Sequence, residues 1–144
     1  MHFIIGGAFN GKRAWVKNTY NVYENKQWVS AYDNHPLPKN LIEFAHDVVI
    51  LEGVEIWLKQ LSATIVADKC REIWSNYLEN WLTWEQAGFD RKLVVIGTDI
   101  SKGIVPMEAE KRRWRDVTGW AYQDITAKSE KVDVIWYGLN QKIK

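Results

Sequence analysis

Several features that often define a function are scarce or absent in this sequence of 144 residues. A single cysteine, Cys70, allows no internal disulfide and no paired-cysteine zinc motif. The three histidines, His2, His35 and His46, show no metal-ligand spacing with one another. The longest apolar runs fall well short of the ~18 residues that span a bilayer, and the N-terminus lacks the basic leader and apolar run of a signal peptide. We therefore expect a cytoplasmic protein with a reduced core cysteine and no membrane partner.

Charge of one sign is also lacking, because 19 Lys and Arg residues nearly balance 18 Asp and Glu residues, for a formal net charge of +1. A near-neutral chain does not predict the broad basic surface of a nucleic-acid-binding protein, so we expect no nucleic-acid partner. One local basic cluster consists of Lys111, Arg112, Arg113 and Arg115. Its spacing is typical of a solvated helix face. The alternatives are a phosphate clamp or an interface in which Asp116 pairs with the cluster.

Tryptophan, in contrast, is abundant, with nine residues in a chain that is 47% hydrophobic. The length suits one domain with a substantial core, so we expect a single domain over residues 1–144. Large aromatic side chains are suited equally to a core and to a subunit contact. The Trp-rich segment 55–89 is consistent with both.

Apolar runs and helical spacing alternate along the chain. Apolar runs predict strands at residues 2–5, 47–53, 92–99 and 131–144, the last with a possible hairpin turn at 138–140, and a further strand and loop lie over 25–40. Three- and four-residue spacing and end signals predict helices at 11–25, at 41–47 with Asn40 and Glu43 as its capping box, at 55–88 with at least one break, and at 105–130 from near Pro106. This alternation indicates an α/β fold with a mainly parallel central sheet flanked by helices, in which ligands bind beyond the carboxyl ends of the strands.

One glycine-rich segment follows the first predicted strand. Residues 6–13, GGAFNGKR, nearly complete a phosphate-binding loop, in which backbone N–H groups hold phosphate oxygens and Lys12 reaches the β- and γ-phosphates. The usual pattern has Ser or Thr where Arg13 stands, so the hydroxyl that helps to hold Mg²⁺ is missing. The alternative is a glycine-rich turn with an incidental lysine. The predicted nucleotide-binding residues are Gly6, Gly7, Ala8, Phe9, Asn10, Gly11, Lys12 and Arg13.

Two acids stand at the ends of later predicted strands. Glu52 occupies the position at which phosphate-loop enzymes place a carboxylate that helps to hold Mg²⁺ or orients a hydroxyl. Asp99 ends the next strand and could serve similarly, although each acid is also consistent with an ordinary solvated or turn residue. Lys12, Glu52 and Asp99 are therefore the candidate catalytic residues, and Glu52 is the candidate metal ligand. The expected ligands are GTP or ATP and Mg²⁺.

The C-terminal third carries a more specific pattern. The residues that form it are Gly103-Ile104-Val105-Pro106, Arg112, Trp114, Arg115-Asp116, Gly119, Gln123, Gly138 and Lys142-Ile143-Lys144. This pattern resembles the adenosylcobinamide kinase / adenosylcobinamide-phosphate guanylyltransferase family of cobalamin synthesis, as do residues 6–13 and the strand that ends at Glu52. The resemblance implies a P-loop fold, phosphoryl transfer from GTP or ATP to a corrinoid hydroxyl, and a homo-oligomer, which is a trimer in that family.

The sequence departs from the family pattern at positions that bear on catalysis. The family's second strand and the helix with its guanylyl-carrying histidine have no counterpart here, and His35 lies on the wrong side of the Trp28 segment. The family's Asn-Glu pair has become Thr98-Asp99, which keeps one carboxylate. The resemblance therefore implies a kinase that has lost guanylyltransferase activity. The alternatives are a catalytically impaired homologue that binds nucleotide or regulates, and a structural relic.

Overall fold

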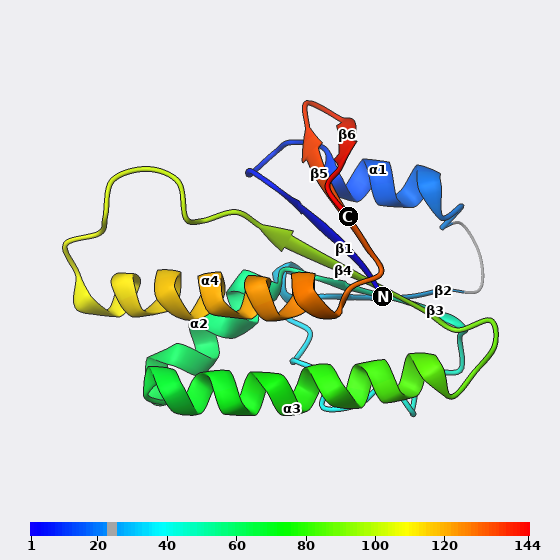
Figure 1. Cartoon of the computed structure of the whole chain (residues 1–144), viewed down its shortest axis with the longest axis horizontal. Coiled ribbons are helices and arrows are strands. Elements are labelled where there is room, and N and C mark those ends of the chain that lie inside the picture. The colour runs from blue at the N-terminus through cyan, green and yellow to red at the C-terminus, as the bar shows by residue number, and fades with distance from the viewer. Residues whose placement is uncertain (23–25) are drawn as a thin grey trace.

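A computed structural model describes residues 1–22 and 26–144 and shows strands alternating with helices (Figure 1). The strands are β1 (His2–Gly6), β2 (Lys26–Ser30), β3 (Val48–Glu52), β4 (Lys92–Thr98), β5 (Lys131–Trp136) and β6 (Leu139–Lys142). The helices are α1 (Lys12–Thr19), the 3₁₀ helix η1 (Ala31–Asp33), α2 (Val54–Thr64), α3 (Ala67–Gln86) and α4 (Ala109–Lys128). None of the helices in the described residues is long and apolar enough to cross a membrane.

The strands form one six-stranded sheet in the order β2-β3-β4-β1-β5-β6. Neighbouring strands are parallel, except that β5 and β6 form an antiparallel hairpin. The carboxyl ends of β1, β3 and β4 meet at one edge, where Gly6 pairs with Thr98 and Glu52 pairs with Ile96. The predicted α/β fold with a mainly parallel sheet is confirmed, and this edge is where such a sheet binds ligands.

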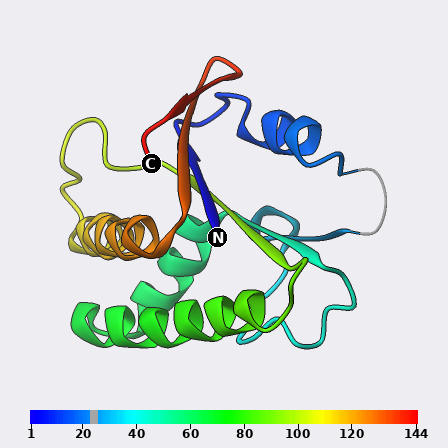
Figure 2. The same ribbon diagram turned by 45° about the vertical axis from the view of Figure 1, so that its right-hand side comes forward.

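Helices cover the two faces of the sheet unequally. On one face lies α1, whose Val16 packs with Ile4 and Ile50 of the sheet. On the other face lie α2, α3 and α4 (Figures 1 and 2), over a larger apolar cluster that includes Leu51 and Val95. The central strands are buried from both sides, which is why they read as continuous apolar runs in the sequence.

The Trp-rich segment contributes to the core. Trp57, Trp74 and Trp81 are almost completely buried, and the rings of Trp74 and Trp81 meet edge to face at 5.4 Å. The indole N–H of Trp57 donates to the His35 carbonyl at 2.8 Å, and that of Trp81 donates to the Pro38 carbonyl at 2.9 Å. These bonds hold the loop between η1 and β3 against the helices. The structure thus supports the core role for these side chains.

The short helix predicted at 41–47 is wrong. Asn40 does accept a hydrogen bond from the Ile42 N–H, at 3.3 Å. The segment then makes one turn, which the Phe44 N–H closes by donating to the Leu41 carbonyl at 3.2 Å. Leu41 is fully buried, so it anchors the turn to the core. This tertiary contact overrides the local capping pattern.

Two helix boundaries also differ from the prediction. α1 ends at Thr19 rather than at residue 25, because Asn21 adopts a φ of 48°, which a right-handed helix does not accommodate. Residues 23–25 of the predicted helix lie outside the described residues. α4 begins at Ala109 rather than near Pro106, since residues 99–108 form a loop. The predicted break in the segment 55–88 is confirmed between α2 and α3.

A buried hydrogen-bond chain fixes the amino-terminal end of β1, opposite the glycine-rich loop. The Nε2 atom of His2 lies 2.7 Å from Oδ2 of Asp133 on β5, and its Nδ1 atom lies 2.6 Å from the Tyr20 hydroxyl. Burial lowers the pKa of His2 below its usual 6.5, although the Asp133 carboxylate opposes this shift. Burial likewise raises the pKa of Tyr20 to about 12. The imidazole of His2 in this hydrogen-bond chain is therefore neutral at neutral pH.

We expect His2 to make the free energy of unfolding depend on pH between about 7 and 5. Because the folded-state pKa lies below 6.5, the unfolded chain takes up the proton first, so this stabilisation is present above pH 6.5 and is lost as the pH falls. Urea unfolding at a series of pH values measures the slope. His2→Gln should flatten it. An equal slope in His2→Gln and the parent protein would contradict the assignment.

Candidate phosphate-binding site

The glycine-rich loop after β1 is shaped by close contact with the C-terminal hairpin. A Cβ atom on Gly6 would lie 2.3 Å from the Ile135 carbonyl oxygen of β5, so a larger residue does not fit. Gly11 has a φ of 87°, and a Cβ atom there would meet the backbone of Gly138 at 3.1 Å. The Gly138 N–H donates to the Asn10 carbonyl at 2.9 Å. The hairpin therefore fixes the path of the loop.

The turn of that hairpin lies at Tyr137 and Gly138, whereas the sequence predicts it at 138–140. Both residues have positive φ, 51° and 79°, as a two-residue hairpin turn of the primed type requires. The predicted hairpin is confirmed, with its turn starting one residue earlier. This position brings the Gly138 N–H to the loop.

Lys12, the first residue of α1, is held inside the loop. Its Nζ atom donates to the carbonyl of Gly6 at 3.0 Å and to that of Gly7 at 2.7 Å. The residue is only 9% exposed. Burial lowers the pKa of Lys12, and the charges of Glu55 and Glu52 oppose this shift. The ammonium group is thus positioned by two carbonyls that a phosphate group could replace as partners.

Arg13 lies between two carboxylates at the same edge. Its Nη1 atom is 3.6 Å from Oε2 of Glu52, and its Nη2 atom is 3.7 Å from Oδ2 of Asp33. The guanidinium carbon lies 5.2 Å from the ring centroid of Trp28. The Trp28 indole N–H donates to the same Oε2 atom of Glu52 at 2.8 Å. Glu52 is buried, so the arginine supplies its charge partner and the indole its hydrogen bond.

Lys12, Arg13 and Glu52 line one cavity of about 350 Å³ at the carboxyl edge of the sheet. Loop residues, including Phe9, and Thr98 of β4 complete its wall. The structure therefore brings the predicted loop lysine and the predicted acid of β3 together.

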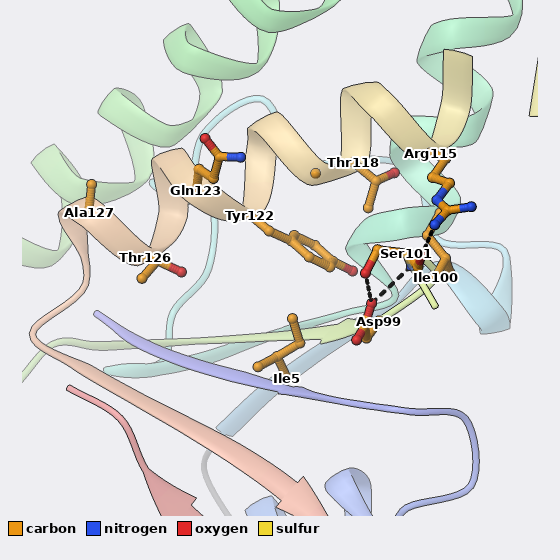
Figure 3. A pocket seen from close by; sticks show the side chains of 11 residues that line it. Ile5, Asp99, Ile100, Ser101, Arg115, Thr118, Tyr122, Gln123, Thr126 and Ala127 are labelled. Carbon is orange, nitrogen blue, oxygen red and sulfur yellow. Dashed lines mark hydrogen bonds between the residues drawn. The ribbon is translucent and has the colours of Figure 1, made fainter. Parts of the chain in front are cut away.

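Asp99, the third candidate catalytic residue, lies on the other side of the loop. Its N–H donates to the Gly6 carbonyl at 3.0 Å, and its Oδ1 atom accepts from the Ser101 N–H and hydroxyl at 2.9 Å and 2.6 Å (Figure 3). Burial opposes ionisation, but the Ser101 bonds and the charge of Lys102 hold the pKa of Asp99 below its usual range. Asp99 lines a cavity of about 580 Å³ that does not include Lys12, and it lines a second cavity of about 460 Å³ together with Gly6, Gly7 and Asn10 of the loop.

Helix α4 forms the opposite wall of the cavity of about 580 Å³ (Figure 3). Arg115 donates to the Ser101 carbonyl there, whereas the other cations of the basic cluster are exposed. Thr118 is 1% exposed, and its hydroxyl has no hydrogen-bond partner within the described part of the chain. A buried hydroxyl without a partner beside a cavity is a group that a ligand can satisfy.

Sequence reasoning misses one residue at this edge, Glu55 in the first turn of α2. It is 2% exposed and accepts hydrogen bonds from the Thr98 N–H at 2.9 Å, from the Tyr122 hydroxyl at 3.2 Å and from the Tyr32 hydroxyl. Burial, reinforced by Glu55, raises the pKa of both tyrosines, so both remain hydrogen-bond donors. In the sequence, Glu55 stands in the first turn of a predicted helix, where acids are common because they interact favourably with the helix dipole. Its position therefore gives no signal that it is buried.

Glu55→Leu should lower the free energy of unfolding by about 1–3 kcal/mol, because the buried Thr98 N–H loses its acceptor and the Tyr32 and Tyr122 hydroxyls lose a charged partner. Urea unfolding monitored by tryptophan fluorescence measures the change. The matched control is Glu110→Leu, in the exposed first turn of α4, which should change stability by less than about 0.5 kcal/mol. A loss in Glu55→Leu no larger than in the control would show that Glu55 does not organise this edge.

The residues beside the loop do not fit a divalent cation. Mg²⁺ requires near-octahedral oxygen ligands at about 2.0–2.1 Å, and Arg13 offers no oxygen. The Oε2 atom of Glu52 already accepts from Trp28 and faces the guanidinium group. The metal-ligand role of Glu52 stays a prediction that its contacts do not favour.

A mainly parallel sheet whose first strand ends in a glycine-rich loop around a helix-start lysine defines a P-loop fold. A model of the family described as cobinamide kinase / cobinamide phosphate guanyltransferase matches residues 24–143, and the chain belongs to this family. The resemblance seen in the C-terminal motifs is thereby confirmed. The match begins after the loop, so the loop itself rests on the geometry described above. No curated protein matches the chain.

Membership places the chain among kinases and transferases of cobalamin biosynthesis that bind nucleotides. The family uses nucleoside triphosphates with a metal ion and acts on corrinoids.

Proposed function

We propose that this protein binds the phosphates of GTP or ATP on residues 6–13 and transfers the γ-phosphate to a corrinoid hydroxyl. The observation that carries the proposal is the buried Lys12 ammonium, which the Gly6 and Gly7 carbonyls hold beside Arg13. Two cations and a glycine-rich turn at the start of a helix provide the charge and the N–H donors that a triphosphate requires.

The acceptor would occupy the larger cavity beside Asp99. In phosphoryl transfer the acceptor oxygen forms a bond to the γ-phosphorus while the bond to the β,γ-bridging oxygen breaks, and the hydroxyl proton must leave. Ser101 holds Asp99 in its ionised form, which can orient the hydroxyl and accept that proton. Lys12 would stabilise the charge on the phosphate oxygens. Glu52 would help to orient the reacting groups from β3.

We propose further that the family's guanylyl transfer is lost. A covalent guanylyl intermediate requires a nucleophilic histidine beside the phosphates. Only residues 20–25 join α1 to β2, too few for a further strand and helix. His2 is engaged by Asp133 and Tyr20, and the ring of His35 accepts from the Ser30 N–H at 3.1 Å in an exposed loop.

A nucleotide-binding homologue without turnover is the second candidate. Its support is Arg13, which replaces the hydroxyl of the usual loop and pairs with the acid of β3. Either function is compatible with the homo-oligomer expected from the family, a trimer by resemblance. The loop before α4 exposes Ile104, Val105 and Met107, which would suit a subunit contact. A turnover assay with cobinamide separates the two candidates.

Lys12→Ala should weaken the binding of GTP or ATP by about 10- to 100-fold, the range expected for losing a charge-assisted hydrogen bond. Isothermal titration calorimetry measures the Kd. Lys17→Ala removes an exposed lysine from the same helix and should leave the Kd within roughly 2-fold of the parent value. Equal affinity in Lys12→Ala and the parent would remove the loop from the proposal.

If guanylyl transfer is lost as proposed, incubation with GTP labelled at the α-phosphorus should leave no label on the denatured protein. Gel electrophoresis at neutral to alkaline pH, which preserves phosphoramidates, detects an adduct. A stable labelled band that disappears on mild acid treatment would refute the claim that guanylyl transfer is lost. A parallel incubation with GTP labelled at the γ-phosphorus is the control, because it detects simple phosphorylation of the protein.

A further inference from the structure

The start of α1 carries two adjacent cations, Lys12 and Arg13, and no acid in its first turn. The amino end of a helix has a positive partial charge, so cations there are unfavourable and anions are favoured. The phosphate loop explains Lys12. The usual pattern provides no role for a cation at the next position, where a hydroxyl normally helps to hold Mg²⁺. The charge on Arg13 therefore requires a separate explanation.

Two carboxylates and one aromatic ring surround the guanidinium group of Arg13. Carboxylates from two elements face it, Glu52 from β3 at 3.6 Å and Asp33 from η1 at 3.7 Å, and the Trp28 ring lies against it. Both distances exceed the ~2.7–2.9 Å of a strong charge-assisted hydrogen bond. The side chain is also 47% exposed. The guanidinium group is thus held loosely, with its donors available to an incoming anion.

A divalent cation and this guanidinium group would compete for one place. A metal ion bound to Glu52 would lie within a few ångströms of the Arg13 charge and would be repelled by it. Arginine supplies a permanent charge and a planar fork of donors that matches two phosphate oxygens. Arginine would therefore supply one of the two positive charges of Mg²⁺ and a fixed orientation of the phosphate oxygens, without any metal ligand.

We propose that Arg13 takes the place of the divalent cation, so that this site binds the metal-free nucleoside triphosphate. This inference rests on the proposed function, because it concerns the same loop. On binding, the guanidinium group stays beside Glu52 and directs its free N–H donors toward the phosphate oxygens, while the Trp28 indole keeps its hydrogen bond to Glu52. The preferred ligand is the free polyanion rather than its magnesium complex.

The test is calorimetric titration of ATP and GTP into the parent protein, first with EDTA and then with excess Mg²⁺. We expect the Kd to be the same or tighter with EDTA. Arg13→Ser should weaken metal-free binding by about tenfold or more, in line with loss of a bidentate charged contact, and added Mg²⁺ should then recover affinity. Lys17→Ser is the matched control, because it removes a cation that also lies near Trp28, at 5.9 Å, but outside the loop.

The outcomes separate this inference from the proposed function. If the parent protein binds nucleotide at least about tenfold more tightly with Mg²⁺ than with EDTA, Arg13 does not take the place of the ion. The proposed nucleotide site would still stand. If neither ATP nor GTP binds the parent protein, with EDTA or with Mg²⁺, and the titrations of Lys12→Ala look the same, the proposed nucleotide site is wrong. This inference then fails with it. Circular dichroism melting of Arg13→Ser establishes that the variant is folded. Arg13→Gln, which keeps a polar side chain with N–H donors but not the charge, should behave like Arg13→Ser without metal.

Discussion

The close approach of Gly6 to the Ile135 carbonyl of β5 constrains the rest of the site. With only 2.3 Å available for a Cβ atom, the chain must leave the sheet at a glycine. The hairpin of β5 and β6 then fixes the loop a second time, through Gly138 and Asn10. The helix that follows is consequently placed with its amino end, and Lys12, over the carboxyl edge of the sheet. The C-terminal strands thus shape a site whose recognisable motif is N-terminal.

The opposite side of the site depends on a buried acid. Glu55 accepts hydrogen bonds from η1, β4 and α4, so one carboxylate joins three elements that are distant in the sequence. Its charge also acts on the Lys12 ammonium group, whose burial it helps to offset. The two acids nearest the loop therefore divide their roles. Glu55 organises the protein, whereas Glu52 faces the cavity and the guanidinium group.

The sequence predicts the sheet well because the central strands are buried on both faces and read as uninterrupted apolar runs. It fails where a long-range contact decides local structure, as at Leu41, whose burial limits a capped segment to one turn. The loop, Glu52 and Asp99 are recognisable from their positions at strand ends. Glu55 is not, because an acid in a first helical turn is ordinary and only folding shows that it is buried. Nor does the sequence show that Arg13 meets Glu52, since β3 lies two strands away from β1.

The contact between Arg13 and Glu52 gives a buried acid a partner within the protein. A carboxylate buried as deeply as Glu52 is costly unless a charge partner and hydrogen bonds compensate it. In a phosphate loop with a hydroxyl at position 13, a bound metal ion would supply part of that compensation, and only while nucleotide is present. Here Arg13 and Trp28 supply it in the protein itself. The arginine and the acid therefore form one unit, and the contacts of Glu52 contribute to the stability of the fold as well as to any chemistry at the site.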